Sequence, residues 1–127
     1  MNFEEAKKVT ESFIEQSAGW LSKNKLSELP DYSELREKEV VGELYAKDTR
    51  YYEQLTNYKS TYFGLIAFYT KYEITADREG KRLSSSMVTY LQNKSKEIDT
   101  KLEAAKNRLT FYKTIIYMIG NVIYGAD

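Results

Sequence analysis

The chain has 127 residues, enough for one domain, and it contains no cysteine and no histidine. The missing cysteine excludes disulfides and thiol chemistry, and the missing histidine removes the commonest general base at neutral pH and the commonest zinc ligand. Nineteen Lys/Arg balance nineteen Asp/Glu, but residues 1–70 carry nine basic against twelve acidic side chains and residues 71–127 carry ten against seven. This mild polarity is far weaker than the positive charge of a typical DNA-binding domain.

The sequence predicts neither a secretory signal nor a membrane span. Residues 1–5 are acidic where a signal peptide carries positive charge. The longest apolar stretch, residues 111–124, contains Lys113 and Asn121 and is too short and too polar to cross a bilayer. We therefore expect a soluble cytoplasmic protein.

The first predicted element is a short amphipathic helix at residues 2–18 or slightly beyond. Apolar side chains such as Phe3, Ala6 and Phe13 share one face, and charged side chains line the other. Gly19 is the expected end of this helix. The polar segment after it ends at Pro30, the only proline, so residues 1–30 are predicted to be a helix and a connector.

The second predicted helix spans residues 31–79. Asp31 and Glu34 have the spacing of a capping box, with aspartate in place of Ser or Thr, and Pro30 disfavours helix upstream. From residue 41 onward, apolar residues recur at alternating steps of three and four, and only Asp48 breaks the rule. This stripe consists of Val41, Leu44, Asp48, Tyr51, Leu55, Tyr58, Tyr62, Leu65, Tyr69, Tyr72 and Ala76.

The third predicted helix spans residues 84–124, with Ser84, Ser85 or Ser86 as its cap. Its stripe has the same spacing and the same length, and only Ser95 is polar. The stripe consists of Val88, Leu91, Ser95, Ile98, Leu102, Ala105, Leu109, Tyr112, Ile116, Ile119 and Ile123.

A period of 3.5 residues held over five heptads predicts a supercoiled helical seam. Because the two stripes are equally long and a short segment joins them, we expect the helices to fold back on each other. Gly80 is predicted to end the second helix in the left-handed conformation, with the hairpin tip at residues 77–84. The predicted fold is therefore all-α: one domain with a long antiparallel helical hairpin and a short N-terminal helix.

The second helix is rich in aromatic residues. The tyrosines in the stripe are expected to be core residues, each with its hydroxyl at the wet rim of the seam. The aromatic residues outside the stripe suggest a different role, because exposed rings can stack on nucleic-acid bases. These off-stripe candidates are Tyr45, Tyr52, Phe63 and Phe68.

The end of the third helix is apolar on nearly every side. One hairpin partner covers only one stripe, so a second surface must bury the rest. The N-terminal helix is one candidate for that surface, and a further copy of the chain is the other. We favour a homo-oligomer, formed through Phe111, Ile115, Met118, Ile119 and Val122.

No arrangement typical of catalysis, of a metal site or of a cofactor site is present. The sequence lacks a glycine-rich phosphate loop and every His-dependent or Cys-dependent nucleophile. Paired carboxylates such as Glu4/Glu5 and Glu37/Glu39 lie in charged stretches typical of a solvated helix face. We therefore expect a non-enzymatic protein with no catalytic residue, metal ligand or cofactor.

The strongest polar cluster is the predicted hairpin tip. Lys71, Arg78, Lys81 and Arg82 lie within twelve residues, beside the hydroxyls of residues 84–86. This set of donors suits a phosphate group, although a solubilising turn has the same composition. Three further cations recur every seven residues along one edge of the third helix and extend the predicted nucleic-acid-binding surface. They are Lys94, Lys101 and Arg108.

The order of these features resembles the UvsY family, the recombination mediators of T-even-type phages. The resemblance covers roughly residues 45–125. It consists of a Tyr-rich helix ending in Lys71-Tyr72-Glu73, a basic turn with Gly80-Lys81, and then Tyr90-Leu91, Lys94, Lys96, Ile98-Asp99-Thr100-Lys101-Leu102, Lys106-Asn107-Arg108, Phe111-Tyr112 and Gly125.

This resemblance implies a small helical protein that oligomerises through its C-terminal region and binds single-stranded DNA. It also implies partners, a recombinase and a single-strand-binding protein, and a location in the host cytoplasm. By position, the basic tip would contact DNA and residues 111–124 would hold the oligomer together. Two departures from the family are the neutral charge and the end of the chain soon after Gly125.

Two functions from different classes remain after this reasoning. The first is an oligomeric accessory protein that binds single-stranded DNA and helps to load a recombinase. The second is a coiled-coil interaction module without nucleic-acid binding, such as an adaptor, a phage assembly chaperone or an inhibitor of a host protein. The neutral net charge supports the second function.

Overall fold

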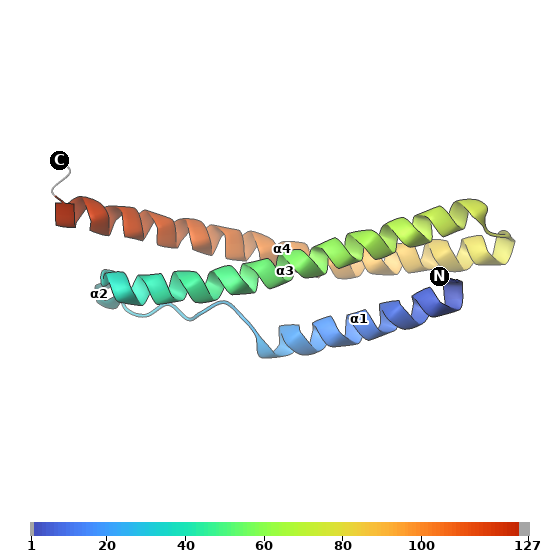
Figure 1. The fold of residues 1–127 in the computed structure, drawn as a ribbon, viewed down its shortest axis with the longest axis horizontal. Helices are drawn as coiled ribbons and strands as arrows, with labels where there is room; N and C mark the ends of the chain where they lie inside the picture. Colours follow the sequence, from blue (N-terminus) through green and yellow to red (C-terminus); the bar gives the residue numbers. More distant parts are fainter. Residues whose placement is uncertain (1, 125–127) are drawn as a thin grey trace. The chain divides into compact units, whose positions relative to one another are not determined.

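The computed structural model describes residues 2–124, except for the side chains of residues 74, 75 and 122–124. It is 89% helical, and no strand occurs in the described part of the chain. The helices are α1 (Phe3–Lys23), α2 (Tyr32–Leu35), α3 (Lys38–Thr75) and α4 (Arg78–Tyr124) (Figure 1). The two long helices, α3 and α4, pack against each other as a hairpin, which confirms the predicted all-α fold.

The N-terminal helix extends beyond residue 18, as the predicted range allowed. Asn2 caps it, because the Asn2 side-chain oxygen accepts a hydrogen bond from the Glu5 backbone N–H at 2.8 Å. Gly19 was the predicted end, but α1 continues through Gly19 to Lys23. The extra turn places Trp20 against Tyr58, with ring centroids 5.5 Å apart, and this aromatic contact favours the longer helix.

The predicted second helix is divided in the structure. Asp31 precedes only the four-residue helix α2, and its side chain forms no capping hydrogen bond. The chain then turns at residues 36–37, and the long helix α3 begins at Lys38. Asp31 therefore marks a helix start, as predicted, but the helix that follows it is α2.

The turn of the hairpin lies earlier and is shorter than predicted. Only Ala76 and Asp77 separate α3 from α4, so the expected tip at residues 77–84 is mostly helical. Asp77 is the cap, because its Oδ1 accepts a hydrogen bond from the Gly80 N–H at 2.8 Å. Gly80 does not take the left-handed conformation, and Ser84, Ser85 and Ser86 lie inside α4. Gly80 is needed for space instead, since a Cβ there would lie 2.8 Å from that of Ala76.

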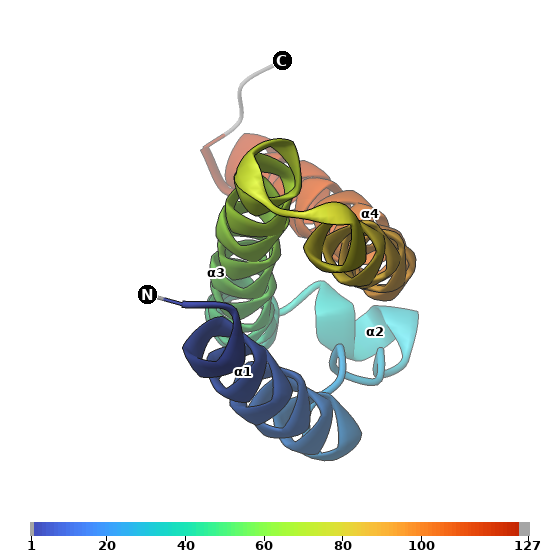
Figure 2. The same cartoon turned by 90° about the vertical axis from the view of Figure 1, so that its right-hand side faces the viewer.

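The contacts of the chain group its residues into two compact units, and each unit contains part of both long helices. Unit 1 comprises Met1–Lys25 and Thr56–Asp99, and unit 2 comprises Leu26–Leu55 and Thr100–Asp127. Within unit 1, α1 runs alongside α3 (Figure 2). Phe3 packs on Tyr69, whereas Phe13 packs on Tyr62, so the two helices are antiparallel.

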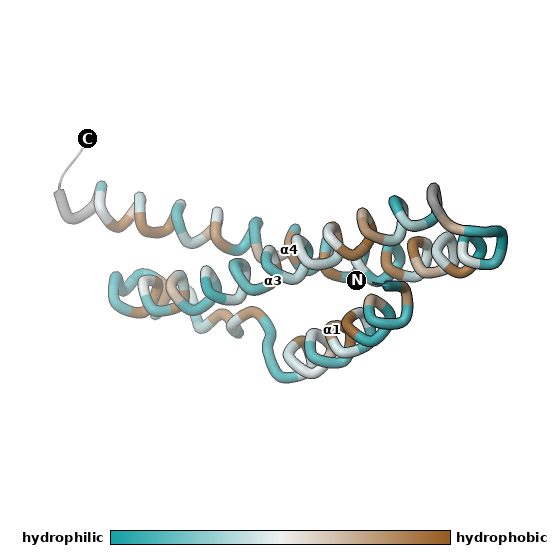
Figure 3. Tube along the Cα trace, turned by 45° about the vertical axis from the view of Figure 1, so that its right-hand side comes forward, coloured by the Kyte–Doolittle hydropathy of each residue, from teal (hydrophilic) through white to brown (hydrophobic). Residues whose placement is uncertain are grey.

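Burial follows the predicted heptads along both long helices. Figure 3 shows hydrophobic residues interspersed with hydrophilic ones along both helices. Buried residues spaced by seven on α3 are Val41, Asp48, Leu55, Tyr62 and Tyr69. Buried residues spaced by seven on α4 are Ser84, Leu91, Ile98, Ala105 and Tyr112. The alternate stripe positions of α4, from Val88 to Leu109, are only half-buried.

The core of unit 2 departs from the predicted stripe at its end. It contains Leu35 of α2, Val41 of α3, and both Tyr112 and Ile115 of α4. The stripe predicted that Ile116 follows Tyr112 into the core, but Ile115 is buried and Ile116 is exposed.

Within the described residues, no helix has the length and apolar character needed to cross a membrane.

Candidate nucleic-acid and self-association surfaces

The four cations predicted at the hairpin tip are all exposed. Lys71 belongs to the last turns of α3, and Arg78, Lys81 and Arg82 belong to the first turns of α4. Within the described part of the chain, none of the four forms an ion pair. The same turn holds Glu73, Asp77 and Glu79, so the net charge of residues 71–82 is +1.

The serines predicted beside these cations are only partly available. Ser84 is fully buried, and its hydroxyl has no hydrogen-bond partner among the described residues. Ser85 and Ser86 are exposed. Two of the three predicted hydroxyls, those of Ser85 and Ser86, are therefore accessible beside the cations.

The predicted line of cations along α4 is not uniform. Lys94 is half-buried, and its Nζ lies 5.9 Å from the centroid of the Tyr90 ring. Lys101 is exposed, but Arg108 has buried partners. Lys94 belongs to unit 1 together with the four tip cations, and Lys101 and Arg108 belong to unit 2.

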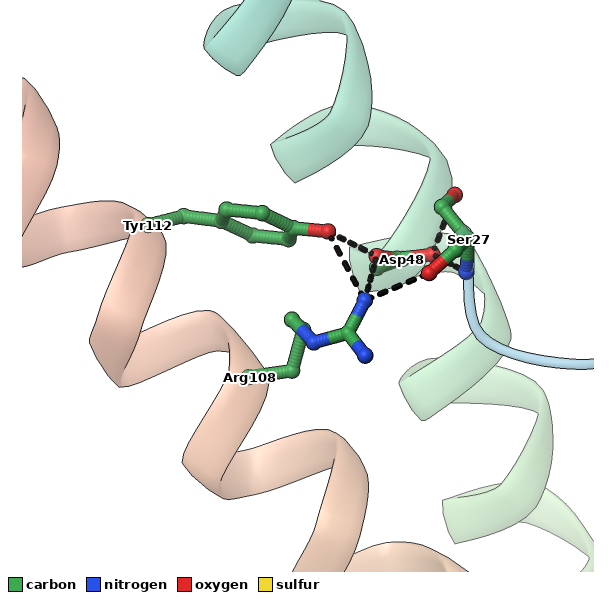
Figure 4. Close-up of polar contacts among 4 residues, drawn as sticks. All are labelled: Ser27, Asp48, Arg108 and Tyr112. Atoms are coloured by element: carbon green, nitrogen blue, oxygen red, sulfur yellow. Dashed lines mark hydrogen bonds and ion pairs between the residues drawn. The ribbon is translucent and has the colours of Figure 1, made fainter. Parts of the chain in front are cut away.

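Arg108 is part of a polar cluster inside unit 2 (Figure 4). The cluster is built around Asp48, whose side chain is only 1% exposed. Asp48 Oδ1 accepts hydrogen bonds from the Ser27 N–H at 3.0 Å and from the Ser27 hydroxyl at 2.8 Å. Asp48 Oδ2 accepts one from the Tyr112 hydroxyl at 2.5 Å and lies 3.9 Å from Arg108 Nη1.

The cluster provides hydrogen-bond partners for the Asp48 carboxylate, whose charge would otherwise be costly to bury. Arg108 Nη1 also donates to the Ser27 carbonyl at 2.5 Å and to the Tyr112 hydroxyl at 3.3 Å. Burial raises the pKa of Tyr112, and its hydrogen bond to Asp48 raises that pKa further. Each group in the cluster has a partner, so we assign it a structural role that ties the connector to both long helices.

Sequence reasoning assigned Arg108 to a DNA-binding surface and offered no explanation for Asp48. The structure shows that both residues serve the interior of unit 2. The sequence did contain one signal for this cluster. Asp48 is the one charged residue in the α3 stripe, and a charge in an apolar seam requires a partner.

The aromatic residues of α3 are mostly packed against other rings. The stripe residues Tyr51, Tyr58, Tyr62 and Tyr69 are buried, as predicted for core tyrosines, and Tyr72 is half-buried. The Tyr69 hydroxyl does not lie at the wet rim as predicted, because it is hydrogen-bonded to the buried Thr10. Among the four off-stripe candidates for base stacking, Tyr45, Tyr52 and Phe68 are half-buried. Tyr45 contacts the ring of Tyr112, and Phe68 contacts Tyr69 and Tyr72. Phe63 alone among the four is exposed, with 66% of its surface accessible.

Only part of the predicted oligomer surface on α4 is accessible in the structure. Phe111 and Met118 are exposed, as a self-association surface requires, and so are Ile116 and Tyr117. Ile115 is a correction, because it is buried in the core of unit 2, and Ile119 packs against the same core. The side chain of Val122 lies outside the described part of the chain.

Unit 1 also contains a groove that the sequence did not predict. It has a volume of about 580 Å³ and lies between α1 and the first turns of α4. Its apolar lining comes from Phe3 and Ile14 on α1 and from Leu83, Met87 and Tyr90 on α4. Leu83 and Tyr90 remain exposed, so the groove opens to solvent.

Among the described residues, no group of three or more Asp or Glu side chains has the arrangement of a metal site. No family model, curated protein or solved structure matches this chain.

Proposed function

We propose that the protein is a non-enzymatic, oligomeric accessory protein that binds single-stranded DNA. In this proposal it acts like the UvsY-family mediators it resembles, by helping to load a recombinase onto DNA coated with single-strand-binding protein. The DNA-binding residues are Lys71, Arg78, Lys81 and Arg82, extended along α4 by Lys94 and Lys101. Arg108 is not among them, because its guanidinium is engaged by Ser27, Asp48 and Tyr112.

The observation that carries the proposal is the charge of α4. This helix holds nine Lys/Arg against four Asp/Glu, a net charge of +5, in a chain whose net charge is zero. Lys81, Arg82, Lys101, Lys106 and Lys113 are all exposed on it. Excess positive charge on one helix attracts a phosphate backbone through counterion release, without any base-specific contact.

One copy offers few phosphate contacts, so the proposal requires several copies on one strand. Binding gains accumulate when linked sites engage the same ligand, because each further contact becomes intramolecular. The exposed apolar residues Phe111, Ile116, Tyr117 and Met118 are the surface that would join the copies.

The test is a fluorescence-anisotropy titration of labelled oligothymidylate with the full chain across a range of salt concentrations. We expect sequence-independent binding that weakens steeply with salt. Replacing Arg78 and Arg82 by Ala should lower the slope of log affinity against log salt by about 0.7 per lost phosphate contact. The helix content, read by circular dichroism, should not change.

The matched control replaces Arg36 and Arg50 by Ala, because both are exposed and the net charge changes equally. We expect this control to bind DNA nearly as well as the wild type. Equal losses in the two double variants would contradict a binding surface at the tip. No binding by the wild type even at roughly 50 mM salt would contradict the proposal as a whole.

The second candidate function is an interaction module without nucleic-acid binding. The open apolar groove of unit 1 favours it, because such grooves receive amphipathic helices in many complexes. The same titration separates the two functions, since this module would leave DNA unbound at low salt.

A further inference from the structure

The groove of unit 1 has two unlike walls. The α1 wall carries three carboxylates and one cation, a net charge of −2, and these residues are Glu4, Lys7, Glu11 and Glu15. The α4 wall carries no charge and consists of Leu83, Ser86, Met87 and Tyr90. A ligand that contacts both walls therefore meets negative charge on one side and apolar side chains on the other.

The three carboxylates form one row along α1. Glu4 and Glu11 are seven residues apart, and Glu11 and Glu15 are four apart, so all three lie on one side of the helix. All three are exposed, and none takes part in an ion pair within the described part of the chain. The edge of the groove on α1 therefore presents negative charge that no cation of the chain neutralises by direct contact.

The base of the groove offers no free hydrogen-bonding group. Thr10 is the one fully buried residue that lines it. The Thr10 hydroxyl donates to the Ala6 carbonyl at 2.8 Å and lies 2.7 Å from the Tyr69 hydroxyl. The neighbouring lining residues Phe3 and Ile14 are half-buried and apolar. An occupant must therefore place apolar groups at the base of the groove.

The groove is long and open, which favours a helix as its occupant. The α1 lining runs from Phe3 to Glu15, about 18 Å at the rise of an α-helix. Leu83 and Tyr90 on the other wall are 40% and 45% exposed. A small-molecule pocket surrounds most of its ligand, whereas an open groove between helices receives one apolar face of a helix and leaves the other in water.

We propose that this groove binds an amphipathic helix of a partner protein, with Lys or Arg on the flank of its apolar face that meets α1. The cations must lie beside the apolar face, because the row of carboxylates borders the groove. In a helix with apolar a and d positions, the flanking positions are e and g. This site goes beyond the proposed DNA binding and does not rest on it, since a carboxylate edge repels phosphate.

The exposed end of α4 does not have this pattern. Phe111 and Met118 are seven residues apart and share one side of that helix, but Lys106 and Lys113 lie on roughly the opposite side. When Phe111 and Met118 face the groove, both cations face away from the carboxylates. The charge pattern therefore favours a different protein over a second copy of this chain.

The test uses three synthetic helical peptides of identical composition. Each has Leu at every a and d position, and the same number of Lys at e, at g or at f, with Gln and Ala elsewhere. The e and g peptides cover the two directions in which a helix can lie in the groove, and the f peptide places Lys opposite the apolar face. In anisotropy titrations with the full chain, the better of the e and g peptides should bind about tenfold tighter than the f peptide, because its cations meet the carboxylates.

Two pairs of substitutions separate this row from charge in general. Glu11→Gln with Glu15→Gln should remove the preference for the flanking position. The matched control is Glu43→Gln with Glu53→Gln, because both residues are exposed, lie outside the groove and change the net charge equally. The control should keep the preference. Equal effects in the two double variants would overturn the proposal.

A second comparison tests the apolar wall. Leu83→Ser should weaken the binding of all three peptides, because each buries its Leu face against that wall. Phe63→Ser is the matched control, since Phe63 is an exposed apolar residue of the same unit that does not line the groove. It should leave the affinities unchanged. Circular dichroism of both variants checks that the fold is kept.

Three further outcomes would overturn the proposal. The first is equal affinity for the three peptides, and the second is no binding of any peptide at roughly 100 micromolar protein. The third is sedimentation in which the wild type self-associates and Leu83→Ser alone, without Phe63→Ser, becomes monomeric, because a second copy would then fill the groove.

The result is separable from the DNA-binding proposal. The variant with Arg78→Ala and Arg82→Ala should lose DNA affinity and bind the peptides as the wild type does. Peptide binding without DNA binding would leave the groove assignment correct and the proposed function wrong, and DNA binding without peptide binding would mean the reverse.

Discussion

Units 1 and 2 each contain one segment of α3 and one segment of α4, but a different third element accompanies the pair in each unit. In unit 1 the third element is α1, a helix of 21 residues whose aromatic rings pack against those of α3. In unit 2 the third element is a connector with the four-residue helix α2. The two units also bury different kinds of polar group.

The polar interiors of the two units show this difference. Tyr69 in unit 1 forms a 2.7 Å hydrogen bond with the Thr10 hydroxyl, a contact between neutral groups. Tyr112 in unit 2 donates to the Asp48 carboxylate, and Arg108 lies beside it. In unit 1 the long helix α1 is held mainly by apolar contacts. In unit 2 the short connector is held by hydrogen bonds to charged groups, which are stronger than those between neutral groups.

The largest test of this comparison removes the cation of unit 2. Arg108→Met should lower the free energy of unfolding by about 3 kcal/mol, because it leaves a buried carboxylate without its counter-charge. Lys94→Met is the matched control at the equivalent heptad position in unit 1, and it should cost less than about 1 kcal/mol. Urea unfolding followed by circular dichroism measures both. Equal losses of unfolding free energy in the two variants would mean that Arg108 stabilises unit 2 no more than Lys94 stabilises unit 1.

The second test removes one hydroxyl from each unit. Tyr112→Phe should cost about 2 kcal/mol, because the lost hydrogen bond has a charged and buried acceptor. Tyr69→Phe should cost about 1 kcal/mol, since its acceptor is neutral. The same unfolding measurement applies, and a larger loss for Tyr69→Phe would reverse the comparison.

The third test compares the helix caps of the two units. Asp77→Ala should cost about 1 kcal/mol, because the Asp77 side chain accepts the Gly80 N–H at the start of α4. Asp31→Ala should change stability by less than about 0.5 kcal/mol, since that side chain forms no capping bond. Thermal melts of the two variants should therefore differ. Similar melting temperatures would show that the turn does not depend on its cap.

The smallest effect at neutral pH comes from the buried tyrosines. Burial raises the pKa of Tyr69 in unit 1 and of Tyr112 in unit 2. Since the folded state holds these protons more tightly, their contribution to stability is constant below pH about 10 and declines above it. Alkaline unfolding followed by phenolate absorbance should begin above that pH. Tyr69→Phe and Tyr112→Phe should each flatten the decline, and a stability loss between pH 7 and 9 would have another cause.

The periodic part of the fold could be predicted from the sequence, because a heptad stripe specifies which helix faces meet. The turn could not be placed, because Gly80 is also typical of a helix end, and its real role is to leave space beside Ala76. The sequence also did not predict that Ile115, and not Ile116, follows Tyr112 into the core. Residues 115 and 116 are both isoleucine, so hydrophobicity alone does not choose between them.

The exposed cations of the tip were predictable, since charged residues at a turn stay in water. The role of Arg108 was not, because its partner Ser27 is 81 residues away in sequence. A heptad position shows that a side chain flanks the seam, but it does not show which distant segment lies there. The groove of unit 1 was missed for the same reason, since it requires the packing of α1 beside α4.

The Asp48 cluster also limits how the two long helices can be aligned. A seven-residue repeat allows α4 to slide along α3 by one heptad and still pair apolar residues. Sliding in one direction would bring Ile115 and Ile119 to the places of Arg108 and Tyr112, and neither side chain can donate a hydrogen bond. Sliding in the other would bring Lys101 and Ala105, which loses the hydroxyl donor. A single aspartate in an otherwise repetitive seam thus distinguishes the native register from its neighbours.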